Sequence, residues 1–504
     1  MRLLRALTIG AAALAVAACS LQPTNTGSGG GGNNAALTVD LASYPASLDP
    51  GQQYDTDSYS VYRNIFDQLL HRDATTNKIV PWLATKWTQT DPTTWVFTIR
   101  DGVKFTDGTP LTAQDAAFSI TRILDPSFAS QQNANFSAIA SATGSGQQLT
   151  IKTKYPSPTL LTYLTTLSVV PMAYVQKVGN AQFNLKPMGS GPYSFVSDIP
   201  GSQVVLTRNP DWWGGQPSIK DVTFRAVPDV ASRVADLQSG KAQIASELTP
   251  DSANQIKNSL QVLSAPTERV SYLAFNTIDG GPTNNVNVRK AISLAIDYNS
   301  LVNNLEGGFA KRVNSVATPL NLGYSTSLPD YTYNPTQAKT LLQQAGAEGQ
   351  TITMATSPSY DPEIVQAIQA NLQDVGLKVQ IQNTDQATYL EKVQSPQHNW
   401  GSIRFGQWSC SCEDSDGTIY PLFHTGTVWS SYTNPQFDSL VDQARQTLDQ
   451  SSRNSLYKQA YQLLGQDLPG VGLFQFVAIY GAAKDVRWKP DAQQSFFVAD
   501  MKLS

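Results

Sequence analysis

The sequence has little charge for a chain of its length. Charged residues make up 15% of its 504 residues, against about 25% in an average soluble domain. The 35 basic and 39 acidic residues give a formal net charge of −4, which supplies no basic field for a phosphate backbone. We therefore expect no nucleic acid partner.

Cysteine is also scarce. The three cysteines are Cys19, Cys410 and Cys412, too few and too clustered for a disulfide framework. The chain is several times longer than the usual domain of about 100–150 residues. It therefore has room for two or more domains, or for one structure of elaborated lobes, held together by hydrophobic cores.

Motifs of several enzyme classes are missing. The sequence contains no Gly-x-x-x-x-Gly-Lys-Ser/Thr loop, no Gly-x-Gly-x-x-Gly after a strand and no His-Glu-x-x-His. Ser190 lacks the outer glycine of a nucleophile elbow. None of the three histidines, His71, His398 and His424, lies near a nucleophile in a recognisable frame. We expect no enzyme, no catalytic residue and no cofactor, with an exported hydrolase as a remote alternative.

The first nineteen residues have the pattern of a secretory signal. Arg2 and Arg5 precede an apolar run at 6–18, which is shorter than the roughly 20 residues of a membrane span. The run ends in Val-Ala-Ala before Cys19, and small residues before a cysteine resemble the lipobox of bacterial lipoproteins. Residues 1–18 are predicted to be a signal peptide and Cys19 to be lipidated. The alternative is cleavage at a nearby Ala-x-Ala, with Cys19 lost or incidental.

Residues 19–36 are predicted to be the lipidated cysteine and a flexible tether. They lack apolar periodicity and contain four consecutive glycines. The ends of such a tether lie roughly 20–25 Å apart. No other run in the sequence approaches the length of a membrane span. We expect an exported protein anchored to the outer face of the cell membrane by Cys19, on the periplasmic side if the cell has an outer membrane.

Residues 94–123 combine strand and helix signals. Residues 95–100 alternate apolar and polar side chains, and a turn then predicts a returning strand at 103–105. Thr112 and Asp115 resemble a capping box, which predicts a helix through Ile123.

Residues 351–381 have a strand–helix–strand pattern. Residues 351–355 and 377–381 have the composition of strands, and Asp361 and Gly376 are typical of the start and end of a helix. Such a unit predicts parallel strands with a right-handed crossover. The sequence therefore favours the α/β class.

One block carries a family resemblance. Residues 81–122 read PWLATKWTQTDPTTWVFTIRDGVKFTDGTPLTAQDAAFSITR. They resemble the signature of family 5 extracytoplasmic solute-binding proteins, the dipeptide, oligopeptide and nickel binders of bacterial ABC importers, with Ile99 in place of the usual Leu. Further blocks follow in the family's order at 189–193, 209–213, 273–276 and 288–297.

The resemblance implies an α/β, two-lobe fold of the type II periplasmic-binding-protein kind. A ligand between the lobes contacts both and shifts an open–closed equilibrium, and the closed form docks on ABC permease subunits. We expect a monomer that binds a small molecule or a peptide. The predicted boundaries are lobe I at 37–269 and 478–504, with an extra sub-domain at about 46–185, and lobe II at 270–477.

The segment 407–414 departs from the family. In peptide-binding members a Trp-x-x-Asp segment of lobe II supplies an aspartate for the ligand's α-ammonium, because a buried cation needs a partner. Here Trp408 matches and Ser411 stands in the aspartate's place. Either Glu413 or Asp414 balances the ammonium through a shifted loop, or the ligand has no free N-terminus. Both alternatives stay open.

Cys410 and Cys412 lie in the same segment, and three states are possible for them. An exported pair tends to oxidise, although a one-residue spacing is tight for a disulfide. Two thiolates with His398 or His424 could bind a soft metal, and free buried thiols are the third state. The spacing matches no recognised zinc pattern, so we expect no metal.

Aromatic side chains crowd the same part of lobe II and suit stacking on a ligand, with the hydrophobic core as the alternative. The resemblance places contacts opposite them in lobe I. The candidate ligand-binding residues are Tyr54, Asp55, Phe405, Trp408, Cys410, Ser411, Cys412, Glu413, Asp414, Trp429 and Tyr432.

The predicted function is a lipid-anchored receptor that delivers an oligopeptide or a peptide-sized polar metabolite to an ABC permease. The alternative on the same scaffold is a receptor for an oligosaccharide, an opine or a metal chelate.

Overall fold

The computed structural model describes residues 35–325 and 328–504. The predicted signal peptide, Cys19 and the tether up to residue 34 lie outside the described residues. The first strand, β1 (Ala35–Leu41), begins at Ala35. The predicted tether therefore extends two residues too far, because Ala35 and Ala36 pair with β10.

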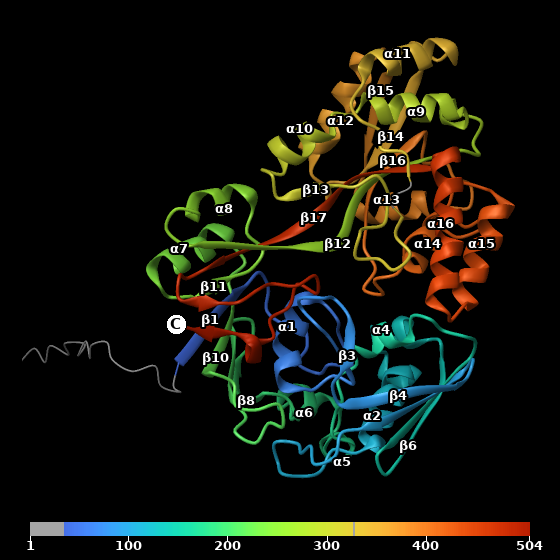
Figure 1. The fold of residues 1–504 in the computed structure, drawn as a ribbon. Helices are drawn as coiled ribbons and strands as arrows, with labels where there is room; N and C mark the ends of the chain where they lie inside the picture. The colour runs from blue at the N-terminus through green and yellow to red at the C-terminus, as the bar shows by residue number, and fades with distance from the viewer. Residues whose placement is uncertain (1–34, 326–327) are drawn as a thin grey trace, which may run out of the picture. The chain divides into compact units, whose positions relative to one another are not determined.

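An eleven-stranded mixed sheet forms the centre of the fold (Figure 1). Its order is β15-β14-β16-β12-β17-β11-β1-β10-β9-β8, and β13 also pairs with β17. Besides β1, the strands are β8 (Tyr193–Ile199), β9 (Gln203–Arg208), β10 (Ile219–Ala226), β11 (Ile244–Ala245), β12 (Gln261–Phe275), β13 (Ala310–Arg312), β14 (Thr351–Thr356), β15 (Lys378–Asn383), β16 (Ile403–Trp408) and β17 (Gly470–Ala482).

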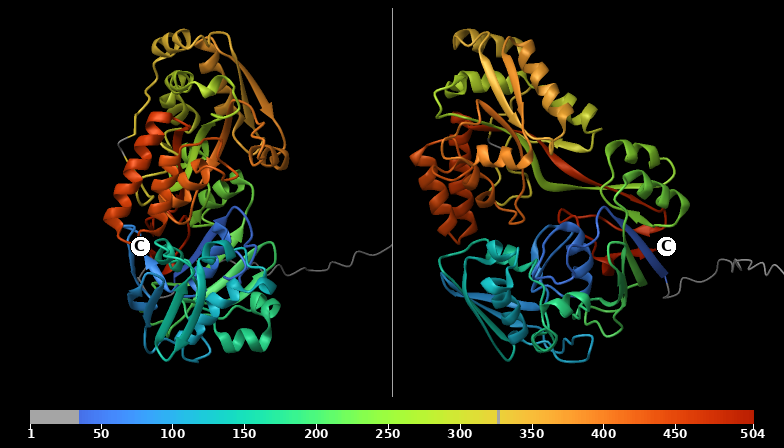
Figure 2. Two further views of the ribbon diagram at one scale, coloured as in Figure 1. Left: turned by 90° about the vertical axis from the view of Figure 1, so that its right-hand side faces the viewer. Right: turned by 180° about the vertical axis from the view of Figure 1, so that it is seen from behind.

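The two long strands β12 and β17 pair antiparallel and join the two halves of this sheet (Figures 1 and 2). Their register shifts between Pro266 and Val270, where residues 267–269 stand opposite Phe476 alone. We call residues 267–269 the hinge bulge. Thr267 fixes it, since its hydroxyl donates to the carbonyl oxygen of Phe476 at 3.0 Å and its carbonyl accepts from the Gln475 amide at 2.6 Å.

Separate hydrophobic clusters lie on each side of these strands. The buried residues of three clusters fall within 37–256 and 479–501, and those of the other three fall within 270–474. We keep the proposed boundaries of lobe I and lobe II on this ground.

Helices cover both faces of the large sheet, and five of them lie within residues 113–185, in the predicted sub-domain of lobe I (Figures 1 and 2). The helices are α1 (Thr56–Ile65), α2 (Ala113–Leu124), α3 (Asn133–Phe136), α4 (Leu160–Leu164), α5 (Met172–Val178), α6 (Asn180–Leu185), α7 (Val230–Ser239), α8 (Pro250–Ile256), α9 (Val286–Ala295), α10 (Tyr298–Ser300), α11 (Pro335–Gln344), α12 (Pro362–Asp374), α13 (Gln386–Val393), α14 (Ile419–Phe423), α15 (Pro435–Gln446) and α16 (Gln450–Asp467).

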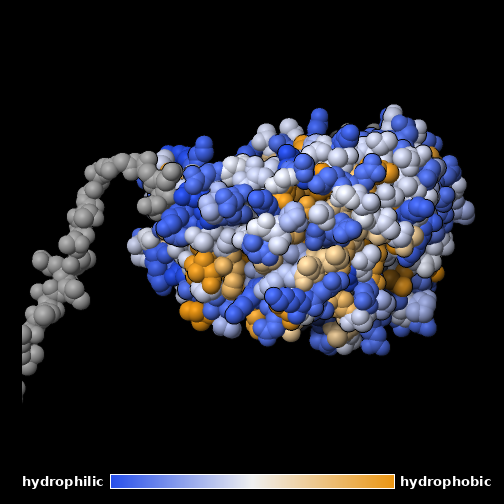
Figure 3. Space-filling model, turned by 90° about the horizontal axis from the view of Figure 1, so that it is seen from below, coloured by the Kyte–Doolittle hydropathy of each residue, from blue (hydrophilic) through white to orange (hydrophobic). Residues whose placement is uncertain are grey.

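The remaining strands form small sheets. They are β2 (Leu70–Arg72) with β3 (Ile79–Pro81), β18 (Val486–Arg487) with β19 (Lys502–Leu503), and a four-stranded sheet of β4 (Ala84–Asp91), β5 (Thr94–Ile99), β7 (Gln148–Thr153) and β6 (Ile139–Ser145). On the face in Figure 3, polar residues separate small groups of apolar ones.

Local sequence signals are confirmed in two places. Strands β14 and β15 pair in parallel, with α12 between them and the Asp361 side chain as its cap. The capping box of Thr112 and Asp115 opens α2. The predicted returning strand at 103–105 is wrong, because β4 and β7 already occupy both edges of β5.

Arg289 is a structural residue of lobe II. It is buried in α9, and its guanidinium donates to backbone carbonyls of two separate segments, residues 283–284 and 467–468. The acceptors are the carbonyl oxygens of Leu468 at 2.9 Å and Thr283 at 2.7 Å, together with those of Asp467 and Asn284. It ties α9 to the end of α16 through main-chain oxygens.

We expect Arg289→Met to destabilise the protein by about 3 kcal/mol, because the change leaves buried carbonyls without donors. Urea unfolding measures this, with Lys339→Met on the exposed face of α11 as the control. Equal midpoints for the two variants would show that these hydrogen bonds contribute little.

Candidate functional site

A cavity of about 680 Å³ lies between lobe I and lobe II. Both lobes and the strands that join them contribute to its wall. Lobe I supplies residues 54–56, ahead of and in α1, and 247–250, ahead of and in α8. The hinge bulge and residues 476–479 of β17 form the side toward the hinge, and lobe II adds Glu306, Phe309, Ser409, Ser411 and Glu413.

Four of the residues predicted as ligand contacts line this cavity. They are Tyr54 and Asp55 from lobe I and Ser411 and Glu413 from lobe II. Asp55 caps α1, since one carboxylate oxygen accepts from the Ser58 amide at 2.9 Å. The other oxygen, Oδ2, is buried and has no hydrogen-bond partner.

The aromatic candidates lie elsewhere. Phe405 is fully buried, because β16 lies between β14 and β12 in the interior of the sheet. Tyr432 is buried, and its hydroxyl donates to the Asp467 carboxylate at 2.5 Å. Trp408 packs edge-on against Trp429 with ring centroids 5.3 Å apart. These four rings pack within lobe II and are not among the residues that line the cavity.

Asp414 is balanced inside lobe II. Its carboxylate forms a buried ion pair with Arg453 of α16 and accepts from the Tyr457 hydroxyl at 3.2 Å. A charge paired in this way is not available to a ligand ammonium. The suggestion that Asp414 replaces the missing aspartate is therefore wrong for this structure.

Glu413 connects the two lobes. Its Oε2 lies 2.5 Å from Nη1 of Arg72 in β2 and accepts from the Asn77 amide at 2.8 Å. Burial raises the pKa of Glu413 to about 7 and lowers that of Arg72, while their mutual attraction acts in the opposite direction on both. Short-range sequence patterns gave no sign of this pair, because its members lie far apart in the chain.

Cys410 and Cys412 are joined by a disulfide, so of the three states considered the structure has the first. Neither cysteine lines the cavity, although Ser409 and Ser411 beside them do. Gly417 packs against both sulfur atoms, leaving no room for a Cβ. Within 35–325 and 328–504, no group of three or more His, Cys, Asp or Glu side chains is placed to hold a metal.

Sequence reasoning missed the charged residues near the hinge. The guanidinium of Arg269, in the hinge bulge, lies 4.3 Å from the ring centroid of Phe476. Burial, with a smaller effect from Asp361, raises the pKa of Glu306 to about 7. Burial also raises the pKa of Glu247, and it lowers that of Arg269. Nothing in the sequence marks these residues, because they reach the cavity from separate parts of the chain, and Arg269 does so through a bulge in strand pairing.

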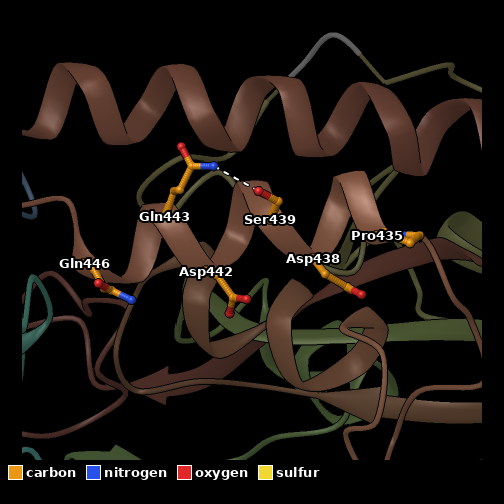
Figure 4. A pocket seen from close by; sticks show the side chains of 6 residues that line it. All are labelled: Pro435, Asp438, Ser439, Asp442, Gln443 and Gln446. Atoms are coloured by element: carbon orange, nitrogen blue, oxygen red, sulfur yellow. Dashed lines mark hydrogen bonds between the residues drawn. The ribbon is translucent and has the colours of Figure 1, made fainter.

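A second hollow lies along α15 (Figure 4). All six residues that line it belong to that helix, and the Gln443 amide donates to the Ser439 hydroxyl at 3.0 Å. With walls from one helix only, this hollow encloses no ligand, and we do not assign a site to it.

Comparison with known proteins identifies the family. The family model of bacterial extracellular solute-binding proteins, family 5 (middle), matches residues 78–430. The chain therefore belongs to this family, which is one of solute-binding proteins rather than enzymes, and it has the type II periplasmic-binding-protein fold. In the described part of the chain, no helix has the length and apolarity needed to span a bilayer.

Three relatives show the extent of the similarity. The chain is 28% identical to the probable D,D-dipeptide-binding periplasmic protein DdpA of Escherichia coli (strain K12) over 92% of its own length and 94% of the relative's. It is 27% identical to the glutathione-binding protein GsiB of the same strain, with the same coverage. The solved structure of HbpA2 from Haemophilus parasuis matches with a TM-score of 0.85 at 23% identity, covering 93% of this chain and 100% of that one.

The ion pair between Arg72 and Glu413 predicts strong coupling. We expect Arg72→Met or Glu413→Gln alone to destabilise the protein by about 3 kcal/mol, since each leaves a buried partner without its counterpart. The double variant should lose about as much as one single variant. A double-mutant cycle by urea unfolding measures this, and additive losses would mean that the two side chains do not interact.

The raised pKa of Glu306 predicts a pH effect on stability. The folded protein holds this proton more tightly than the unfolded chain, so the stability from Glu306 is present below its ordinary pKa and is lost as the pH rises to about 7. We expect Glu306→Gln to reduce the fall in the urea midpoint between pH 5 and pH 7.5. An unchanged fall, matching that of the exposed control Glu348→Gln, would contradict this assignment.

Proposed function

We propose that this protein captures a peptide-like ligand in the cavity between lobe I and lobe II and delivers it to the permease of an ABC importer. The observation that carries the proposal is a cavity of about 680 Å³ walled by both lobes in a member of a solute-binding family. Sites for small ligands commonly have about 300–1,000 Å³. The names of the relatives DdpA and GsiB, which concern a dipeptide and glutathione, support a peptide-like ligand.

In this proposal the ligand contacts Tyr54 and Asp55 of lobe I together with Ser411 and Glu413 of lobe II. A ligand that contacts both lobes binds the closed state more tightly than the open state. This difference in affinity stabilises the closed state. The closed form is the one that the permease recognises. The protein itself catalyses no reaction and acts as a monomer.

We further propose that the protein is exported and held at the outer face of the cell membrane by a lipid on Cys19. The small residues before Cys19 and the glycine-rich segment after it support this anchor.

Peptide binding should stabilise the protein and bring the lobes together. A mixture of random di- and tripeptides is expected to raise the melting temperature by mass action, with about 2.7 kcal/mol gained at a hundredfold excess over Kd. Small-angle X-ray scattering should show a smaller radius of gyration in the same samples.

A mixture of oligosaccharides serves as the control ligand. If sugars raise the melting temperature and peptides do not, the ligand class proposed here is wrong. If peptides bind while the radius of gyration stays constant, the closing of the lobes is wrong.

A further inference from the structure

More carboxyl groups than guanidinium groups line the cavity. Five carboxylates line it, from Asp55, Glu247, Glu268, Glu306 and Glu413, against two guanidiniums, from Arg72 and Arg269. Arg72 and Glu413 form an ion pair and neutralise each other. Four carboxylates and the single cation of Arg269 remain to face the ligand.

Among these carboxylates, Glu268 is buried and has an oxygen without a hydrogen-bond partner. Its residue surface is 9% exposed, and its Oε2 is buried without a hydrogen-bond partner. It lies in the hinge bulge, where the break in pairing between β12 and β17 brings it to the cavity. A buried carboxylate without a partner is costly, so a cation that enters the cavity and pairs with Glu268 gains a large interaction.

No neighbouring cation forms an ion pair with Glu268 within the described residues. In the part of the chain that the structure describes, Glu247, Glu268 and Glu306 form no ion pair within 4.0 Å. Arg269 lies over the ring of Phe476 and attracts Glu247 and Glu306, while Arg233 also attracts Glu247. Neither guanidinium forms an ion pair with Glu268.

A bare metal ion does not fit this arrangement. The described acidic side chains nowhere gather in threes around one point, as ligands of a metal must. Carboxylates spread along a cavity wall suit an organic cation, whose charge sits on a larger body that fills the space.

We propose that the cavity selects ligands with an amine or guanidine group, and that Glu268 of the hinge bulge pairs with that group, supported by Glu306. This inference rests on the proposed function and assigns its ligand class. It places the ligand's cationic group on the hinge side of the cavity, because Ser411 carries no charge and Glu413 and Asp414 are already paired.

Competition between two peptide libraries tests the proposal. The full-length protein is mixed with equal amounts of a random tripeptide library and of the same library with every amine acetylated, and native mass spectrometry identifies the retained peptides. Wild-type protein should retain the free-amine library at least tenfold over the acetylated one, and the acetylated peptides that remain should be rich in arginine. Glu268→Gln should remove most of this preference, and Glu306→Gln should reduce it.

The matched control is Glu348→Gln, an exposed glutamate away from the cavity, which should keep the wild-type preference. The melting temperature of each free variant shows that it is folded before libraries are compared. Equal retention of the two libraries by wild-type protein, or an unchanged preference in Glu268→Gln, would overturn the cation assignment and leave the proposed function standing. Retention of neither library would overturn both.

Discussion

The antiparallel pairing of β12 with β17 is the constraint on which the rest of the structure depends. These strands belong to both halves of the large sheet, so the hydrophobic clusters on either side share one backbone framework. The register of the pairing shifts in two places, and the larger break is at residues 267–269, where Thr267 forms hydrogen bonds with Phe476 and Gln475. A bulge of this kind redirects side chains, and here it brings Glu268 and Arg269 to the cavity.

Much of the fold could be predicted from the sequence, because it depends on local patterns. The capping box at Thr112, the cap at Asp361 and the parallel unit around α12 follow from residue types at fixed spacing. The block at 81–122 predicted the family, and the family model confirms it. The error at 103–105 arose because local alternation says nothing about which strand edges are already occupied.

The candidate site was harder to predict, because it depends on contacts between distant parts of the chain. Asp414 is paired by Arg453 of α16, and Glu413 is paired by Arg72 of β2. Neither partner can be identified from the segment that contains the two acids. The positions of the aromatic residues were hard to predict for a related reason. The sequence does not show that β16 is a central strand, and this central position buries the ring of Phe405 in the core. Only the assembled sheet shows that Glu268, whose Oε2 is buried without a partner, lies in the hinge bulge.

We propose that the two lobes joined by β12 and β17 enclose a ligand whose cationic group pairs with Glu268. A crystal structure with a retained free-amine tripeptide would show this pairing. We expect the peptide in the cavity lined by Tyr54 and Ser411, with a ligand nitrogen at about 2.7–2.9 Å from a carboxylate oxygen of Glu268. A peptide bound in this cavity with its ammonium turned toward Ser411 and away from the hinge would show that Glu268 is not its partner, and a peptide bound outside the cavity would show that the lobes do not enclose it.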